Sequence, residues 1–194
     1  MLPAAALTRT AAGAAVLAGT LLPLRRDRIG RREQMAFRLV NDLPDPLYVP
    51  AWPVMQLGAF GAVPVTAAAA LAAGNRPLAG RLLSGGTAAW ILAKAVKRVV
   101  RRGRPIALLA GVRTRGHEPT GLGYLSGHAA VSVALAAAAW PHLGTGGRRA
   151  TLALTSAVGL SRIYVGAHLP LDVAGGAALG LLVDAASSLR STRS

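Results

Sequence analysis

Two long stretches without a charged residue constrain this chain more than any other feature. They are Leu47–Gly74 and Pro119–Gly147, the second with its histidines counted as neutral. A helix that crosses a bilayer needs about 20 mostly apolar residues, so both stretches are long enough. Of the 194 residues, 53% are hydrophobic and only 15% are charged. These values exclude a disordered chain and favour an integral membrane protein over a soluble domain.

Four further segments are apolar but contain ionisable residues. They are Leu2–Leu24, Pro77–Val100, Arg149–His168 and Pro170–Leu189. We therefore predict an all-α polytopic membrane bundle of about six transmembrane helices, forming a single domain over residues 1–194. The first segment has an alternative, because its apolar run also resembles the central region of a cleaved signal peptide.

A strongly basic segment, Arg25–Asp45, joins the first two predicted spans and holds six arginines. Its apolar residues recur at helical spacing: Met35, Ala36, Leu39 and Val40. This pattern favours an amphipathic helix that lies on the membrane surface between the first two spans. A solvated basic loop is the alternative.

Polar residues of the later spans gather on one side of the membrane. Consecutive helices run in opposite directions, so the ends of the third and fifth spans share a face with the starts of the fourth and sixth. Eight candidate site residues lie at these ends: Lys97, Arg104, Ser126, Gly127, His128, Arg162, His168 and Asp172. Hydropathy alone does not require this convergence, so it predicts a functional site.

The cluster is suited to binding a phosphate group. Arg104 and Arg162 can each bind phosphate oxygens in a bidentate manner, and Lys97 adds a point charge. Ser126 and Gly127 open the fourth span, where free backbone N–H groups and the helix dipole favour an anion. These five residues are the predicted phosphate ligands.

Two histidines and one carboxylate supply the reactive groups. His168 can attack phosphorus through one ring nitrogen if Asp172 holds the other. His128 can protonate the departing oxygen and later activate water. The chain has no cysteine, which excludes thiolate nucleophiles and thiolate metal sites. We expect no metal and no cofactor, because three cationic side chains already neutralise the phosphate.

Each residue also has a plainer interpretation. Lys97 and Arg104 could be interfacial anchors among the neighbouring arginines Arg98, Arg101 and Arg102. Arg162 and Asp172 could form a structural ion pair with each other.

Pro105 disfavours a helical conformation for the residue before it, so we expect the Arg104 guanidinium in a loop position.

Three blocks of the sequence resemble the signature of the type 2 phosphatidic acid phosphatase superfamily. They are KRVVRRGRP at residues 97–105, Ser126-Gly127-His128, and SRIYVGAHLPLD at residues 161–172. The second block departs from the family pattern, which usually has proline where this chain has Leu125. The resemblance implies that His168 is a nucleophile forming a phosphohistidine, that Asp172 orients it, and that His128 is the acid. It also implies that the remaining five candidates bind the phosphate.

We therefore predict a metal-independent membrane phosphatase that removes a terminal phosphate from a lipid. Candidate substrates are polyprenyl phosphates or diphosphates, phosphatidic acid, phosphatidylglycerol phosphate and phosphorylated prenyl-sugar lipids. A lipid phosphotransferase with the same phosphohistidine is one alternative, and a non-enzymatic anion-binding protein or transporter is another. The expected partners are the lipid substrate and membrane lipids. The net charge of +15 does not indicate nucleic acid, because binding DNA would leave the uncharged spans unexplained.

The side of the membrane that holds the site is left open by two opposed arguments. Loops on the site's face carry 13 basic residues and those on the opposite face carry six, so the positive-inside rule favours the cytoplasm. The resemblance implies instead an outer-face site, which many membrane members of the family have. The composition, rich in Ala and Arg and poor in Lys, is typical of a GC-rich bacterium, so we expect the plasma membrane of a bacterium.

Overall fold

The computed structural model describes residues 2–24 and 29–190, with side chains described between residues 7 and 188. Four basic residues counted above, Arg25, Arg26, Arg28 and Arg193, lie outside the described residues. Every regular element in the described ranges is a helix. In chain order these are α1 (Leu2–Leu24), α2 (Arg31–Asn41), η1 (Asp45–Leu47), α3 (Tyr48–Gln56), α4 (Ala62–Ala72), α5 (Arg76–Val100), α6 (Pro105–Leu108), α7 (Gly127–Ala139), η2 (Trp140–His142), α8 (Thr145–Tyr164) and α9 (Pro170–Arg190).

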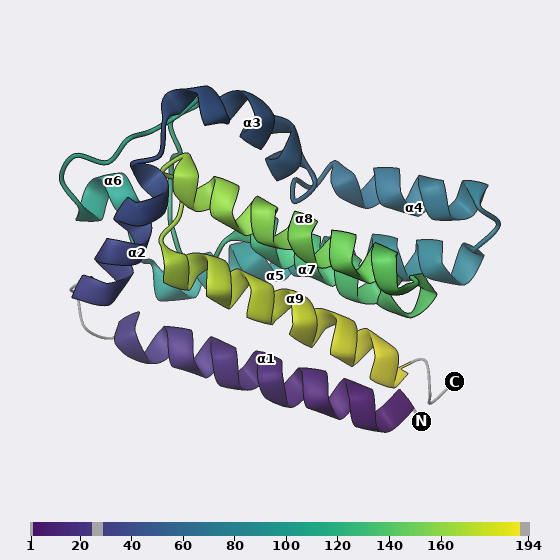
Figure 1. Cartoon of the computed structure of the whole chain (residues 1–194). Helices are drawn as coiled ribbons and strands as arrows, with labels where there is room; N and C mark the ends of the chain where they lie inside the picture. Colours follow the sequence, from purple (N-terminus) through teal and green to yellow (C-terminus); the bar gives the residue numbers. More distant parts are fainter. Residues whose placement is uncertain (1, 25–28, 191–194) are drawn as a thin grey trace.

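Helix α9 is the central element of the bundle. It packs along both α1 and α7, and α5 packs along α7 and α4. Both termini lie at one end of the molecule, and α2 and α6 lie at the other end (Figure 1). One apolar cluster joins Ala130 and Ala134 of α7 to Leu179 and Val183 of α9. The long helices are thus held together by small and medium side chains in close contact.

The second predicted span is not one continuous helix. A turn over residues 57–61 separates α3 from α4, and i→i+3 bonds such as Gly58 N to Met55 O satisfy part of its backbone. The cause is a close approach of α7: a Cβ at Gly58 would lie 2.5 Å from the carbonyl oxygen of His128. The expectation of one helix over Leu47–Gly74 is therefore wrong, because α3 must bend to accommodate the start of α7.

The fourth predicted span also begins later than its uncharged stretch. Residues 119–126 form a glycine-rich connection, and α7 starts at Gly127, after Ser126 caps it. With 13 residues, α7 is about 20 Å long, shorter than a bilayer core. Among the described residues, two helical segments are long and apolar enough to cross a membrane, Leu7–Leu24 and Pro170–Ser188. The regular structure of the described residues is therefore entirely helical, and two of their segments qualify as spans by length and composition.

The amphipathic helix predicted in the basic segment is present as α2. Its one fully buried apolar side chain, Phe37, packs against Ile163 and Leu169. Met35 and Leu39 of the predicted apolar stripe face outward, with 71% and 77% of their surface exposed. A continuous helix excludes the alternative of a basic loop over residues 31–41, and the outward apolar stripe is what a helix on a membrane surface needs.

Asn41 fixes the end of α2 to the end of α8. Its fully buried side chain donates to the carbonyl oxygens of Arg113 (2.8 Å) and Tyr164 (3.0 Å) and accepts from Arg113 N (3.0 Å). Arg115 then donates to the Asn41 carbonyl oxygen at 2.9 Å. Because all of these groups are buried or partly buried, the loop before α7 and the helix α2 are held in one arrangement.

An ion cluster ties three helices together at the end that holds the termini. Asp184 of α9 is buried, forms an ion pair with Arg9 of α1 at 3.0 Å and accepts a hydrogen bond from Arg81 of α5 at 2.7 Å. Arg81 also donates to the Ser188 hydroxyl at 3.2 Å. The cluster explains why ionisable residues are tolerated inside three apolar segments, since each has an opposite charge beside it.

We expect Asp184→Asn to destabilise the fold without touching the predicted site. Two arginines would lose their shared carboxylate, at a cost of about 3 kcal/mol. The measurement is the thermal unfolding midpoint in detergent, with Asp42→Asn as the control, because Asp42 is exposed and its ion pair to Arg38 is 3.9 Å long. Equal midpoints for the two variants would contradict this account.

Gly176 allows α9 to approach the start of α7. A Cβ there would clash with the carbonyl oxygen of Ser126, whereas a Cβ at Gly85 of α5 would meet nothing within 4 Å. Gly176→Ala should therefore lower both the thermal midpoint and any activity that depends on the start of α7. Gly85→Ala should raise stability by about 0.5–1 kcal/mol, as a helical glycine replaced without a clash does. A Gly176→Ala variant with an unchanged thermal midpoint would show that α9 does not lie this close to the start of α7.

Candidate active site

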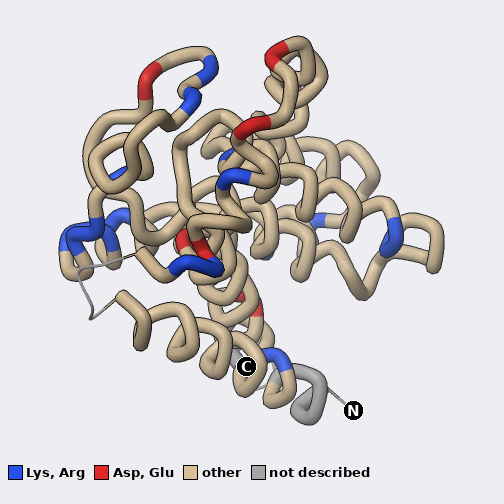
Figure 2. Tube along the Cα trace, turned by 60° about the vertical axis from the view of Figure 1, so that its left-hand side comes forward, with Lys and Arg blue, Asp and Glu red and all other residues tan. Residues whose placement is uncertain are grey.

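All eight predicted site residues lie at the end of the bundle remote from the termini. Lys97 is in the last turns of α5, and Arg104 is the residue before α6. Ser126 caps α7, Arg162 is in the last turn of α8, and His168 lies in the loop between α8 and α9. Most of the basic and acidic positions gather at this end of the chain trace (Figure 2). Several separate segments of the chain therefore supply one cluster.

His168 is at the centre of this cluster, with 3% of its surface exposed. Its Nε2 lies 3.2 Å from a terminal nitrogen of Arg104. A guanidinium can only donate, so Nε2 accepts and the ring proton is assigned to Nδ1. Nδ1 faces Oδ2 of Asp172 at 3.6 Å, longer than a hydrogen bond. This orientation leaves the Nε2 lone pair directed at the cations, where a phosphate would bind.

Asp172 is fully buried, and each of its oxygens has a different partner. Oδ2, which faces His168, accepts from the backbone N–H of Leu169 at 2.9 Å. Oδ1 accepts from Arg102 at 2.8 Å. The main-chain carbonyl oxygen of Asp172 accepts from Ser126 N at 2.8 Å. The first turn of α9 thus fixes both the loop that holds His168 and the residue that caps α7.

Three cationic side chains surround the histidine, and backbone carbonyl groups hold two of them. Lys97 donates to the carbonyl oxygens of Leu122 and Gly123, both at 3.0 Å. Arg104 donates to those of Ala167 at 2.7 Å and Thr120 at 3.0 Å. These bonds attach the cations to the loops on either side of the site, so the charges keep their positions without a fixed anion.

Arg162 contacts the sulfur of Met55 at 3.2 Å and does not pair with Asp172. The ion pair that the sequence left open between these two residues is therefore wrong, because Arg102 occupies the carboxylate instead. The Nε atoms of Arg104 and Arg162 are buried and lack a hydrogen-bond partner in the described part of the chain. Buried donors without a partner are costly, and a phosphate oxygen would satisfy them.

The start of α7 completes the arrangement. The Ser126 hydroxyl caps the helix by accepting from Ala129 N at 3.4 Å. The N–H groups of Gly127 and His128, in the first turn, have no carbonyl partner within the helix. The backbone at Gly127 is uncrowded, since a Cβ there would meet only Ala93 at 3.9 Å. His128 lies within electrostatic range of Lys97, Arg104 and Arg162. This arrangement can bind an anion from three sides.

Two residues of the site were not found from the sequence. Arg102 was grouped with the interfacial anchors, yet its side chain is only 11% exposed and joins Asp172 to Glu33 of α2. Burial would lower the pKa of Arg102, but the hydrogen bonds that Arg102 donates to Glu33 and the charge of Asp172 outweigh it and raise that pKa. The only signal in the sequence was Glu33, an acidic residue within a basic segment. The sequence does not show which arginine Glu33 contacts.

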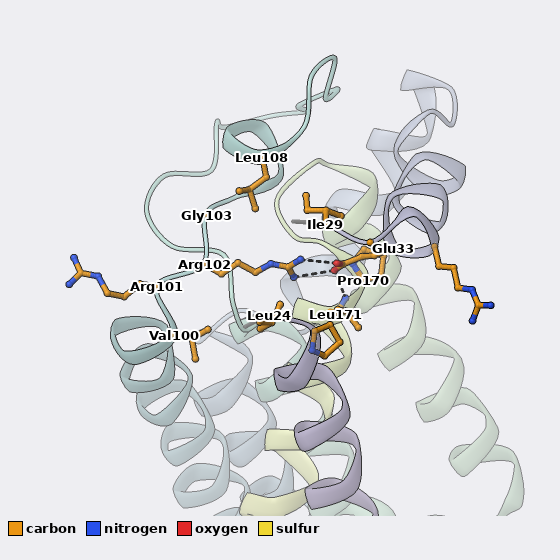
Figure 3. A pocket seen from close by; sticks show the side chains of 13 residues that line it. Leu24, Ile29, Glu33, Val100, Arg101, Arg102, Gly103, Leu108, Pro170 and Leu171 are labelled. Carbon is orange, nitrogen blue, oxygen red and sulfur yellow. Dashed lines mark hydrogen bonds and ion pairs between the residues drawn. The ribbon is translucent and has the colours of Figure 1, made fainter. Parts of the chain in front are cut away.

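A cavity of about 660 Å³ lies beside this ion pair (Figure 3). Its lining includes Glu33, Arg102, Leu24, Ile29 and Leu108, and it includes none of the eight predicted site residues. It is therefore distinct from the cluster around His168. In the described residues there is also no group of three or more His, Asp or Glu side chains placed to hold a metal ion.

The arrangement of these residues agrees with a match to a known family. The chain matches the PAP2 superfamily over residues 78–193, a region that contains all eight predicted residues. The chain belongs to the PAP2 superfamily, whose phosphatases hydrolyse phosphate esters. The resemblance drawn from the three sequence blocks is thereby confirmed.

Two solved structures share the fold. LpxE from Aquifex aeolicus superposes with a TM-score of 0.70 at 25% identity, covering 81% of this chain and 94% of that chain. The transmembrane PAP2-type phosphatidylglycerolphosphate phosphatase from Bacillus subtilis superposes with a TM-score of 0.67 at 22% identity, covering 91% of this chain and 94% of that chain. No curated protein matches the chain by sequence.

The environment of His168 predicts that it stays neutral in acid. Burial is the main cause and lowers the pKa of His168 to about 3, with Asp172 opposing the shift and Lys97 and Arg104 adding to it. Because a lowered pKa keeps the imidazole unprotonated above that pH, His168 should be neutral at pH 5. The measurement is ¹⁵N-histidine NMR in detergent, with the signal identified by its loss in His168→Ala. Protonation near the ordinary pH of 6.5 would contradict this environment.

Proposed function

We propose that this protein is an integral-membrane phosphatase that hydrolyses the terminal phosphate of a lipid through a phosphohistidine on His168. One observation carries the proposal. The Nε2 of His168 accepts from Arg104 while Nδ1 faces the buried Asp172, within a cluster of three cations. Membership of a superfamily of phosphate-ester hydrolases supports the reaction type.

The proposed membrane arrangement has six crossings in one domain over residues 1–194. The crossings are α1, the broken pair α3–α4, α5, α7 with its flanking residues, α8 and α9. Large apolar side chains that face outward support a lipid environment. They include Val49, Val65, Ile91, Leu152 and Leu160. The match to most of the length of a solved transmembrane phosphatase supports the same arrangement.

In the first proposed step, Nε2 of His168 attacks phosphorus and the bond from phosphorus to the lipid oxygen breaks. His128 donates a proton to that oxygen as it leaves. Asp172 faces Nδ1, and its negative charge stabilises the positive imidazole. Lys97, Arg104 and Arg162 stabilise the negative charge on the transferring phosphoryl group.

In the second proposed step, water attacks the phosphohistidine while His128 accepts its proton. The bond from phosphorus to Nε2 breaks, its electron pair returns to His168, and inorganic phosphate leaves. No metal or cofactor is assigned to either step, since the residues named supply the nucleophile, the acid and the positive charge. An alcohol in place of water would give the phosphotransferase, so an acceptor-dependent product distinguishes the two reactions.

The proposed substrates are amphiphiles with a terminal phosphate at headgroup depth. The classes are those expected from the sequence: polyprenyl phosphates or diphosphates, phosphatidic acid, phosphatidylglycerol phosphate and phosphorylated prenyl-sugar lipids. One structural neighbour is a phosphatidylglycerolphosphate phosphatase, so that lipid belongs first in a substrate panel. We place the protein in the plasma membrane, with the site on the cytoplasmic face that the basic loops favour.

The proposal predicts that chemistry and phosphate binding can be separated by mutation. His168→Ala should abolish phosphate release from a panel of lipid phosphates in detergent while inorganic phosphate still binds. Arg162→Ala should lose release and also weaken phosphate binding by about 10- to 100-fold, because it removes charge-assisted hydrogen bonds. Release by the wild type that persists in His168→Ala would exclude the phosphohistidine, and phosphate binding without any release would favour the transporter.

A further inference from the structure

The ion pair that the sequence did not reveal connects the surface helix α2 to the predicted site. Arg102 binds Glu33 through both terminal nitrogens, at 3.1 and 2.7 Å, and one of the same nitrogens binds Asp172 at 2.8 Å. The side chains are 11% (Arg102), 8% (Glu33) and 0% (Asp172) exposed. At such burial the charges are poorly screened by water and salt, so each one acts strongly on the others.

The geometry gives the two oxygens of Asp172 separate functions. Arg102 binds Oδ1, whereas Oδ2 faces Nδ1 of His168. A cation on one oxygen reduces the negative charge that the other presents to the imidazole. Glu33 shares the same cation, so it reduces the pull of Arg102 on Asp172. The balance of these three charges determines how strongly Asp172 attracts the proton of His168.

Glu33 is held in place by more than its ion pair. Its Oε1 accepts from Leu171 N at 3.2 Å, in the first turn of α9 and next to Asp172. Phe37, one turn further along α2, is buried against Leu169. In Figure 3 the Arg102 guanidinium points at Glu33, whereas the Arg101 side chain points away from Glu33. The contact is therefore a built part of the fold, and the neighbouring arginine takes no part in it.

We propose that Glu33 and Arg102 are positioning residues that set the proton affinity of the Asp172–His168 pair. The proposal rests on the proposed role of His168 as the nucleophile. Neither residue touches the phosphate in this account, and both act through the Asp172 carboxylate. The surface helix α2 is then part of the reactive apparatus, and not only an anchor on the membrane.

The other charged groups around His168 are left unchanged in every variant. Lys97 of α5, Arg104 before α6 and Asp172 of α9 act on His168. Arg162 of α8, together with Lys97 and Arg104, acts on His128 of α7. Glu33 from α2 and Arg102 from the loop after α5 are the additional charges that reach the pair through Asp172. Substituting only these two therefore changes the charge on the carboxylate while the phosphate ligands remain.

The test measures the affinity for orthovanadate as a function of pH in detergent. Vanadate resembles the transferred phosphoryl group and needs a neutral His168, so its binding is lost at acid pH as the pair takes up a proton. Arg102→Gln removes the cation and leaves two carboxylates facing each other. We expect the pH of this loss to rise by about 1–3 units, because like charges favour protonation.

A double variant distinguishes this role from a structural one. In Glu33→Gln/Arg102→Gln the repulsion between carboxylates is removed, so the pH at which binding is lost should return toward the wild-type value. Glu33→Gln alone should not raise it, since the amide oxygen still accepts from Arg102 and Leu171. Two results would overturn the proposal. One is a double variant that loses vanadate binding at a higher pH than Arg102→Gln does, and the other is an Arg102→Gln variant with an unchanged pH dependence.

The controls are matched to the two positions. Arg101→Gln removes an exposed arginine next to Arg102, and Asp42→Asn removes an exposed carboxylate of α2's C-terminal end; both should leave the pH dependence unchanged. If Arg102→Gln does not fold, Arg102→Lys provides the test, because it keeps the charge and should keep the pH dependence. A shifted pH dependence in Arg102→Lys would overturn the proposal. Vanadate binding requires no turnover, so a wild type without phosphate release would reject the proposed function separately.

Discussion

One buried carboxylate organises the end of the bundle that holds the predicted site. An ionised group taken out of water is costly unless charges and hydrogen bonds satisfy it, and Asp172 is satisfied by three parts of the chain. Leu169 N fixes the loop that contains His168, and Arg102 brings the loop after α5 and, through Glu33, the surface helix. The backbone at the same position fixes Ser126. The geometry around the histidine is thus the geometry that a buried negative charge requires.

The same end of the molecule carries more positive charge than this carboxylate can neutralise. Lys97, Arg104 and Arg162 lie close enough to repel one another, and two of them rely on backbone carbonyl groups to hold them. Burial lowers the pKa of Arg104, and Asp172 only partly opposes this shift. A phosphate would relieve this repulsion, so binding energy and fold stability are linked here. The proposed reaction uses that relation, since charge on the transferring group is stabilised by groups already in position.

Much of the site could be predicted from the sequence, because alternating spans bring their ends to one face. The loop position of Arg104 followed from Pro105, which disfavours a helix at the preceding residue. The break at Gly58 could not be predicted, since hydropathy does not record the approach of another backbone. The pairing of Glu33 with Arg102 was equally hidden. It joins residues 69 positions apart and depends on where α2 docks, which only tertiary packing determines.

The position of Glu33 has a consequence for whether the N-terminal and C-terminal halves of the chain can be exchanged between relatives. The family match covers residues 78–193, yet one partner of the central ion network lies outside it. A C-terminal half moved onto an N-terminal half without an acid at this position would keep every signature residue and lose this ion pair. A change at position 33 or at position 102 alters the charge that reaches Asp172. The N-terminal segment thus contributes a charge to the ion network at the site, in addition to any role as a membrane anchor.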